Sequence, residues 1–493
     1  MTTSLRKPLP AERAIALKKA IAKRKKRQKE RGIALIMVLG AITILTVFLT
    51  ELQTDTTSAV AGALADRDRL KAEYYAKSAV NLSRLLLASE KPIRLTVAPM
   101  LQLIMQTKKA PQIPVWEFSD MVLGAFNGGD RTTVFGSKIG ADMSTAKNVG
   151  LPGNGYFNVT IVDEDSKINI NTASAATAPA ALIQQLATMF VQPQYVPLFE
   201  ARDADDQFSD AAILCASIID WADPDENLTN CASLDQPASG SEDNIYQSLG
   251  LAYIRKNAPY DSLEELRLVR GMDDDRWATF VDPDPTDPHK RLVTVWGQDT
   301  SANPINVNTA NPQTLWAIVC SASTPDTPIC SDPLQAASFL QVFTLVRTFA
   351  RGAPLFASWA DFSKAMTGQG MIGGFLASLG VSPVTWDPKN GTKAKRKKLF
   401  KSESKMFSIH AEGVVPGTQR EARVHITAVV DMREALDWNK KMQEAQNGGS
   451  ELAENPNSTG LLGVKEEDAI VDDEFVKELK TNPFGSVIYY RVD

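Results

Sequence analysis

The sequence has little of what enzymatic chemistry uses. Only three histidines occur in 493 residues, scattered at His289, His410 and His425. It contains no zinc-ligand pair, no nucleophile elbow and no phosphate-binding loop, and a secreted hydrolase would need one of these or a similar centre. Gly368–Gly373 has the spacing of a dinucleotide fingerprint, but no strand pattern precedes it, so we expect a flexible loop there. The sequence therefore predicts a protein that is not an enzyme.

Positive charge is scarce outside the first residues of the chain. The formal net charge is −5, and residues 1–32 alone hold twelve Lys or Arg and two Glu, a local charge of +10. The rest of the chain therefore carries −15. Binding to a phosphate backbone needs clustered Lys and Arg on the binding domain. The acidic body argues against nucleic acid as the main ligand.

Cysteine is also rare, and no Cys-x-x-Cys motif occurs. The four cysteines form two local pairs, Cys215 with Cys231 and Cys320 with Cys330. In an exported chain this even count favours two disulfides, each stabilising the fold by roughly 2–4 kcal/mol. The alternative is four buried free thiols in a cytosolic protein. Spacing alone leaves the connectivity open.

Charge is absent from residues 33–50, which read IALIMVLGAITILTVFLT. Eighteen apolar residues just span a bilayer, and seven Lys or Arg between residues 23 and 31 favour a cytoplasmic N-terminus with the bulk of the chain exported. The alternative, a cleaved secretory signal, needs small residues at a site after the apolar stretch. Here a helical pattern continues instead, with apolar positions at three-to-four spacing to about residue 90.

Strand patterns are few and far apart. Alternating apolar and polar residues predict strands at 154–163, 405–415, 421–431 and 486–492, with a turn at Pro416-Gly417. Residues 91–150 read as loop with short elements, and 439–480 as an acidic mobile loop. The stretch between the first two strands reads mainly helical and ends in a basic run, 393–401, expected to be a solvated linker, with a protein contact as the alternative. These patterns predict an α+β fold: a long N-terminal helix on a small antiparallel sheet with a large helical insertion.

Two passages inside the insertion repeat one another. Residues 167–173 (KININ-Thr-Ala) and 304–310 (PINVN-Thr-Ala) both place Asn-Thr-Ala before a helical run. Asn and Thr oxygens accept hydrogen bonds from the first turn of a helix, so we expect helix caps and two related helical halves. In the first half, residues 263–272 look like one helix closed by a glycine-containing hairpin.

The N-terminal pattern resembles that of type IV pilins and pseudopilins. In that family a prepilin peptidase cleaves after a leader that ends in Gly, and Gly32-Ile33 fits this site. Most members carry Glu as the fifth mature residue, where this chain has Met37. The missing carboxylate narrows the resemblance to the minor pseudopilin K of type II secretion systems.

Further motifs match the same family, at residues 163–171, 219–223, 240–243 and 257–259. The resemblance covers most of residues 31–493. It implies a cleaved leader (1–32), a membrane and amphipathic helix (33–90), a pilin-like part (91–165), an inserted domain of two SAM-like, helix-hairpin-helix-related halves (166–400) and a second pilin-like part (401–493).

The resemblance also implies a function. Pseudopilin K would cap and nucleate the tip of the periplasmic pseudopilus that drives folded proteins through the outer-membrane secretin. Its implied partners are the I and J minor pseudopilins, the pseudopilus and the prepilin peptidase. One helix would hold it in the inner membrane, with the C-terminal bulk in the periplasm. The alternative is a DNA-uptake pseudopilin whose helix-hairpin-helix insert binds nucleic acid.

One acidic stretch stands out as a candidate metal site. Its oxygen ligands would come from seven residues: Asp220, Asp223, Asp225, Glu226, Asn227, Glu242 and Asp243. Leu228 and Leu234 replace the glycine and glutamate that an EF-hand requires, so only a looser calcium site remains, tied at its base by Cys215 and Cys231. The family's calcium dependence supports this reading, and the alternative is a solvated acidic turn. Asp203, Asp205, Asp206 and residues 273–275 are expected to be solvated turns or caps.

Overall fold

The computed structural model describes residues 11–105, 107, 109–127, 155–175, 180–203, 206–232, 242, 244–248, 250–297, 303–350, 353–417, 420–433, 435 and 484–493. By their internal contacts, residues 1–70 and residues 71–493 are two compact units. The acidic loop expected at 439–480 lies outside the described residues.

In the first unit, the described chain is the start of helix α1 (Ala11–Met105). The apolar side chains of its uncharged stretch lie exposed, Met37 and Ile44 among them at 69% and 72%. Hydroxyls of Thr43 and Thr46 donate to the helix's own carbonyls, which satisfies them without water. Ile33–Leu103 is the one helix among the described residues that is long and apolar enough to cross a membrane.

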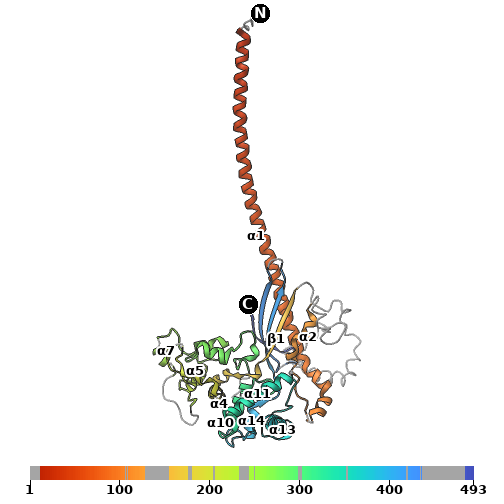
Figure 1. Ribbon diagram of the computed structural model, residues 1–493, viewed down its shortest axis with the longest axis vertical. Helices are drawn as coiled ribbons and strands as arrows, with labels where there is room; N and C mark the ends of the chain where they lie inside the picture. Colours follow the sequence, from red (N-terminus) through yellow and green to blue (C-terminus); the bar gives the residue numbers. More distant parts are fainter. Residues whose placement is uncertain are drawn as a thin grey trace, which may run out of the picture. The chain divides into compact units, whose positions relative to one another are not determined.

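In the second unit, the rest of α1 packs on a four-stranded antiparallel sheet of β1 (Tyr156–Asp163), β6 (Met406–Val415), β7 (Ala422–Asp431) and β8 (Ser486–Val492). The strand order is β1-β6-β7-β8, and Figure 1 shows the strands beside α1. Their inward residues, such as Ile161, Ile409 and Ile426, form one core with Ala72 and Ala76 of the helix. All four predicted strands and the α+β fold are confirmed.

Small residues let α1 approach this sheet closely. Ala72, Ala76 and Ala79 are fully buried on the helix, and Gly413 of β6 faces them. A Cβ atom added at Gly413 would collide with the carbonyl oxygen of Ala72. The backbones of helix and strand therefore touch at this point, and glycine is required by the close approach rather than by its dihedral angles.

Helix α1 does not end near residue 90, so the predicted loop after it is wrong over residues 91–105. The helix continues through Pro92 and Pro99 to Met105. Arg94 bridges Glu90, with Nε 3.2 Å from Oε1, and Glu403, with Nη1 2.7 Å from Oε1. Burial opposes ionisation of Glu403, but hydrogen bonds from Lys109 and Arg94 lower its pKa to about 2. These long-range ion pairs hold a helix segment that its two prolines weaken.

The insertion between β1 and β6 is mainly helical around its own core. Its helices are α4 (Ala180–Phe190), α5 (Val196–Glu200), α6 (Ala211–Asp220), α7 (Asn244–Ser248), α8 (Asp274–Arg276), α9 (Pro312–Ser321), α10 (Pro328–Ser331), α11 (Pro333–Ala350), α12 (Trp359–Met366), α13 (Gly370–Ser378) and α14 (Lys393–Leu399). Helix α2 (Ser119–Leu123) precedes the insertion. Two short parallel pairs join β2 (Ile168–Asn169) to β3 (Val293–Thr294), and β4 (Ile305–Asn306) to β5 (Phe400–Lys401).

Three local predictions in the insertion are wrong. The basic run forms α14 and β5 and is therefore not a linker, although its residues Lys393, Lys395, Lys397 and Lys398 are exposed to solvent as expected. The expected loop at 368–373 starts helix α13 at Gly370. Residues 263–272 form only a 3-10 helix, Leu263–Leu268, before a turn at Gly271 with φ of +80°. Each segment takes its conformation from tertiary packing that local sequence patterns do not report.

Buried acids join the ends of the insertion. At the end of β1, Asp163 accepts hydrogen bonds from the hydroxyls of Thr309 and Ser404. Asp165 pairs with Lys401, with Nζ 2.7 Å from Oδ1, and accepts the backbone N–H of Lys405 at 2.6 Å. Where the chain leaves the sheet and where it returns are therefore fixed to each other.

Glu164 completes this junction. Its carboxylate pairs with Lys167 (Nζ to Oε1, 2.9 Å) and accepts hydrogen bonds from Thr294 of β3 and Ser408 of β6, both at 2.5 Å. Burial opposes ionisation of Glu164, but the charge of Lys167 and these hydrogen bonds leave its pKa lowered. An ionised carboxylate thus links the sheet to the first half of the insertion.

Gly413→Ala should weaken the packing of α1 on the sheet. The added methyl group must push helix and strand apart, so we expect the free energy of unfolding to fall by about 1–3 kcal/mol. Gly374→Ala, in helix α13, is the control, because a Cβ there meets nothing within 4 Å and should be neutral or stabilising by up to about 1 kcal/mol. Denaturant unfolding of the full chain in detergent measures both, and equal effects would contradict the close approach.

Candidate metal centre

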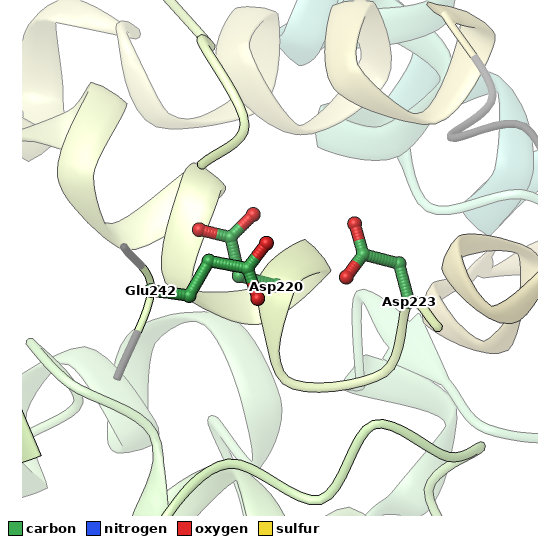
Figure 2. Close-up of side chains that lie close together, drawn as sticks. All are labelled: Asp220, Asp223 and Glu242. Atoms are coloured by element: carbon green, nitrogen blue, oxygen red, sulfur yellow. The ribbon is translucent and has the colours of Figure 1, made fainter. Parts of the chain in front are cut away.

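Three buried carboxylates meet at the end of helix α6. Asp220 is the last residue of the helix, Asp223 lies in the following turn and Glu242 comes from a distant point of the chain. One oxygen of each lies within 4.8 Å of the others, and the residues are 5%, 1% and 4% exposed. Figure 2 shows Asp220 and Glu242 side by side, with Asp223 facing them. Of the seven predicted ligands, the structure brings these three together.

The local sequence explains why these acids are buried. Helix α6 is mostly apolar before Asp220, and Leu214 and Ile219 lie in the core of the insertion. Trp221 and Ala222, which follow the helix, are buried as well. Because apolar residues on both sides are drawn into the core, Asp220 is carried in with them.

Three of the other predicted ligands lie outside the group. Asp225, Glu226 and Asn227 lie exposed on the loop after Asp223. The carboxylate of Asp225 instead accepts the backbone N–H of Asn227 at 2.7 Å, which closes the turn. Asp243 lies outside the described residues. The alternating spacing that suggested ligands at 225–227 belongs to an exposed turn.

Burial makes this cluster costly to ionise. Burial first, and then the charges of Asp220 and Asp225, raise the pKa of Asp223 to about 7. Burial raises the pKa of Asp220 to about 6, against hydrogen bonds from Thr229. Both groups bind protons in the folded chain that they release in the unfolded chain at the same pH. Raising the pH from about 4 to 7 therefore removes stability from this part of the fold.

The sequence patterns did not identify Arg255, a positively charged residue that lies at the acidic cluster. Arg255 is 6% exposed and forms an ion pair with Glu242. The backbone N–H of Asn257 donates to the carbonyl of Trp221 at 3.0 Å, which fastens this arm to the turn that carries the acids. Residues 257–259 matched a family motif in the sequence, but only the fold shows that the arm reaches the acidic cluster.

The three acids fit calcium. Calcium binds oxygen at about 2.3–2.6 Å, so two of its ligands lie at most about 5 Å apart, and the 4.8 Å spread of the cluster satisfies this limit. Oδ1 of Asp223 and Oε1 of Glu242 are buried without a hydrogen-bond partner among the described residues. Buried, unpaired carboxylate oxygens are unfavourable unless a cation or a donor reaches them.

The repeated Asn-Thr-Ala motifs act as clamps rather than helix caps. Asn171 accepts the backbone N–H of Tyr260 at 2.7 Å and donates to the carbonyls of Tyr260 and Val295. Asn308 likewise accepts the N–H of Phe356 at 2.9 Å and donates to its carbonyl. We call these contacts the asparagine clamps. The expected helix caps are wrong, but the predicted relation between the two halves has a structural counterpart.

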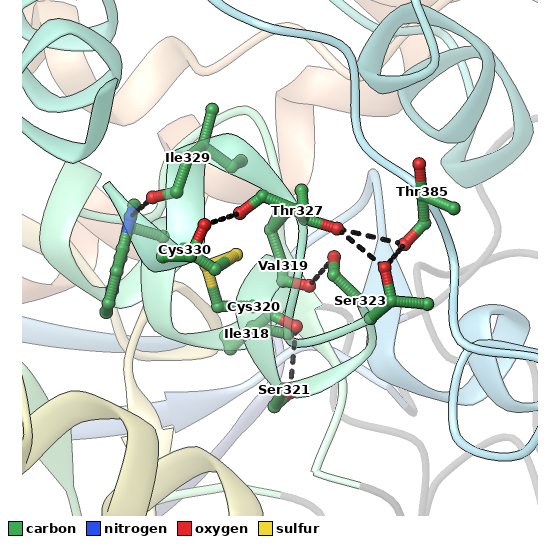
Figure 3. The surroundings of a disulfide bond; sticks show 12 residues. Ile318, Val319, Cys320, Ser321, Ser323, Thr327, Ile329, Cys330 and Thr385 are labelled. Atoms are coloured by element: carbon green, nitrogen blue, oxygen red, sulfur yellow. Dashed lines mark hydrogen bonds between the residues drawn. A yellow bond between two sulfur atoms is a disulfide. The ribbon is translucent and has the colours of Figure 1, made fainter. Parts of the chain in front are cut away.

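Both predicted disulfides form, Cys215–Cys231 and Cys320–Cys330. The first joins helix α6 to the end of the acidic loop. Figure 3 shows the second, where the backbone N–H of Cys330 donates to Thr327 and the indole of Trp316 donates to Ile329 at 2.7 Å. Each half of the insertion thus has one covalent cross-link.

The remaining acids of the sequence prediction are turn and cap residues. Asp203 accepts hydrogen bonds from the N–H of Gln207 at 2.9 Å and from Ser209 at 2.6 Å, and it is buried rather than solvated. Asp273 caps helix α8 by accepting the N–H of Arg276. Asp206 is exposed, and Asp205 lies outside the described residues.

Comparison with known families adds an independent observation. Residues 166–280, which contain the three buried acids, match a family model described as "Type II secretion system (T2SS), protein K". Over this segment, the chain is similar to type II secretion protein K. The resemblance predicted from sequence is confirmed there.

The chain is also similar to a solved chain in the GspK-GspI-GspJ complex of the type 2 secretion system from enterotoxigenic Escherichia coli. The identity is 15% and the TM-score 0.41, over 75% of this chain and 93% of that chain. A comparison with curated proteins finds no match.

Proposed function

We propose that this chain is the minor pseudopilin K of a type II secretion system, with a structural rather than a catalytic role at the tip of the pseudopilus. The observation that carries the proposal is the match of the first half of the insertion to protein K. The match occurs in a chain whose long helix contains an uncharged stretch, residues 33–50, and packs on a four-stranded sheet. The long helix would attach the chain to the membrane and the pseudopilus, and the insertion would add a domain that regular pilins lack.

The start of α1 supports a terminal position in the filament. In related pilins a glutamate at the fifth mature residue neutralises the N-terminus of a neighbouring subunit, and Met37 provides no such charge. A subunit with nothing added above it needs no such contact. The large insertion would block further addition, so the chain caps the filament and nucleates its growth.

The uncharged stretch of α1 also suggests where the chain is located in the cell. Residues 33–50 would lie in the inner membrane, with the basic residues before them in the cytoplasm and residues 71–493 in the periplasm. The prepilin peptidase would cleave between Gly32 and Ile33. An oxidising periplasm agrees with the two disulfides, since such bonds persist in that compartment.

We also propose that Asp220, Asp223 and Glu242 hold a calcium ion. The ion would supply positive charge that offsets the mutual repulsion of the buried carboxylates. Asp220 and Asp223 position the site through helix α6 and its turn, and Glu242 closes it from the following segment. The unpaired oxygens of Asp223 and Glu242 support this assignment.

The partners would be the I and J minor pseudopilins of the same system. Co-expression of the three full-length chains with their prepilin peptidase, followed by purification in detergent through a tag on this chain, should yield one copy of each. Met37→Glu is expected to leave this complex intact, because the tip position makes no use of the charge. Recovery of this chain without I and J would contradict the proposal.

Calcium should stabilise the full chain in detergent, and more at pH 7.5 than at pH 5.5. At pH 5.5 protons on Asp220 and Asp223 compete with the ion, because burial raises the pKa of both groups. Thermal unfolding with calcium or with chelator measures the shift. Asp223→Asn should abolish it, while Asp275→Asn, which changes an exposed acid of the same half, should preserve it. A shift that survives Asp223→Asn would remove the site from the account.

A further inference from the structure

The acidic cluster carries a built-in positive charge that neither its ligand chemistry nor its family match explains. Arg255 is nearly fully buried, and its guanidinium pairs with Glu242, the member of the cluster that comes from farthest along the chain. A buried charge is retained only with a partner. The ion pair between Arg255 and Glu242 is therefore part of the structure of the acidic cluster.

The two residues that follow Arg255 help to fix its position. Asn257, two residues on, is fastened to Trp221 by a backbone hydrogen bond of 3.0 Å. Its neighbour Lys256 points its charge elsewhere, with Nζ 2.7 Å from Asp261 and 3.0 Å from Glu265. The backbone hydrogen bond thus fastens the segment that carries Arg255 to the turn that carries Asp220 and Asp223.

Arg255 changes the net charge that a metal ion would meet at the acidic cluster. Three ionised carboxylates carry −3, and Arg255 reduces the total to −2. One divalent cation then neutralises the site, whereas without Arg255 a single negative charge would remain. Because the coulombic energy scales with the product of the charges, a nearby fixed cation weakens the binding of a trivalent ion more than that of a divalent ion.

We propose that Arg255 is a permanent counter-ion of this centre and a determinant of its specificity for metal ions. Its positive charge adjusts the net charge of the site to that of one divalent cation, and it thereby weakens the binding of cations. The inference rests on the calcium site proposed above. In the metal-free protein, Arg255 partly neutralises the cluster and keeps Glu242 near Asp220 and Asp223. In the protein with calcium bound, Arg255 remains next to Glu242, and its positive charge limits how tightly cations bind.

The test compares three variants of the full chain in detergent, with calcium alone and terbium alone as probes. Trp221 adjoins Asp220 and can sensitise terbium luminescence, and calorimetry measures calcium binding directly. Arg255→Met should tighten calcium binding about tenfold or more and terbium binding by a larger factor. It should also lower the melting temperature of the metal-free protein, since Glu242 loses its partner. Arg255→Lys keeps the charge and should restore the wild-type ratio of terbium to calcium affinity.

Lys256→Met is the matched control, because it removes one positive charge from the same arm without touching Glu242. Its ratio of terbium to calcium affinity should equal that of the wild type. Weaker or unchanged calcium binding in Arg255→Met would overturn the inference and leave the calcium site standing. A wild-type chain that binds neither ion would overturn the calcium site itself, and the role of Arg255 with it.

Discussion

Three consecutive buried acids at the end of β1 are the contact on which the rest of the second unit depends. Strands β1 and β6 are neighbours in the sheet, yet the whole insertion lies between them in sequence. Asp163, Glu164 and Asp165 reach the first half of the insertion, the second half and the return to β6 at once. Burial, and then the charge of Asp165, raise the pKa of Asp163 to about 7. These contacts reinforce the connection between sheet and insertion, which Trp296 and Tyr489 of β8 also make through a ring contact with centroids 5.0 Å apart.

Within the insertion, the same construction is used twice. Each half starts with a short strand, holds a loop with an asparagine clamp, returns to a second parallel strand and contains one disulfide. The halves differ where α6 and α9 end. The first carries its buried acids beyond α6, whereas α9 is followed by hydroxyl residues such as Ser323, which bonds to the helix's own backbone. The cluster of buried acids, at which we propose a calcium ion, therefore belongs to the first half alone among the described residues, within the segment that matches protein K.

The sequence patterns predicted the helices and strands whose apolar residues repeat with a regular local period. Strict alternation identified β6 and β7, and three-to-four spacing identified α1. The missed features depend on distant partners: Arg94 with Glu403 keeps α1 helical past its prolines, and β4 turns part of a basic run into a strand. The candidate ligands show the same division. Asp220 and Asp223 lie next to the buried residues Ile219 and Ala222, whereas no fully buried residue adjoins Asp225 to Asn227, which stay exposed. Arg255 reaches the cluster only through the fold of an arm that begins after Glu242.

These features give one physical account of a filament end. Under the proposed function, the uncharged stretch of α1 would attach the subunit. The cross-linked insertion, held by buried acids, would occupy the space where a further subunit would add. The most direct test is to locate the chain on assembled pseudopili by gold-labelled antibody against the insertion. The account predicts label at one end of each filament. Label distributed along the filament length would contradict it.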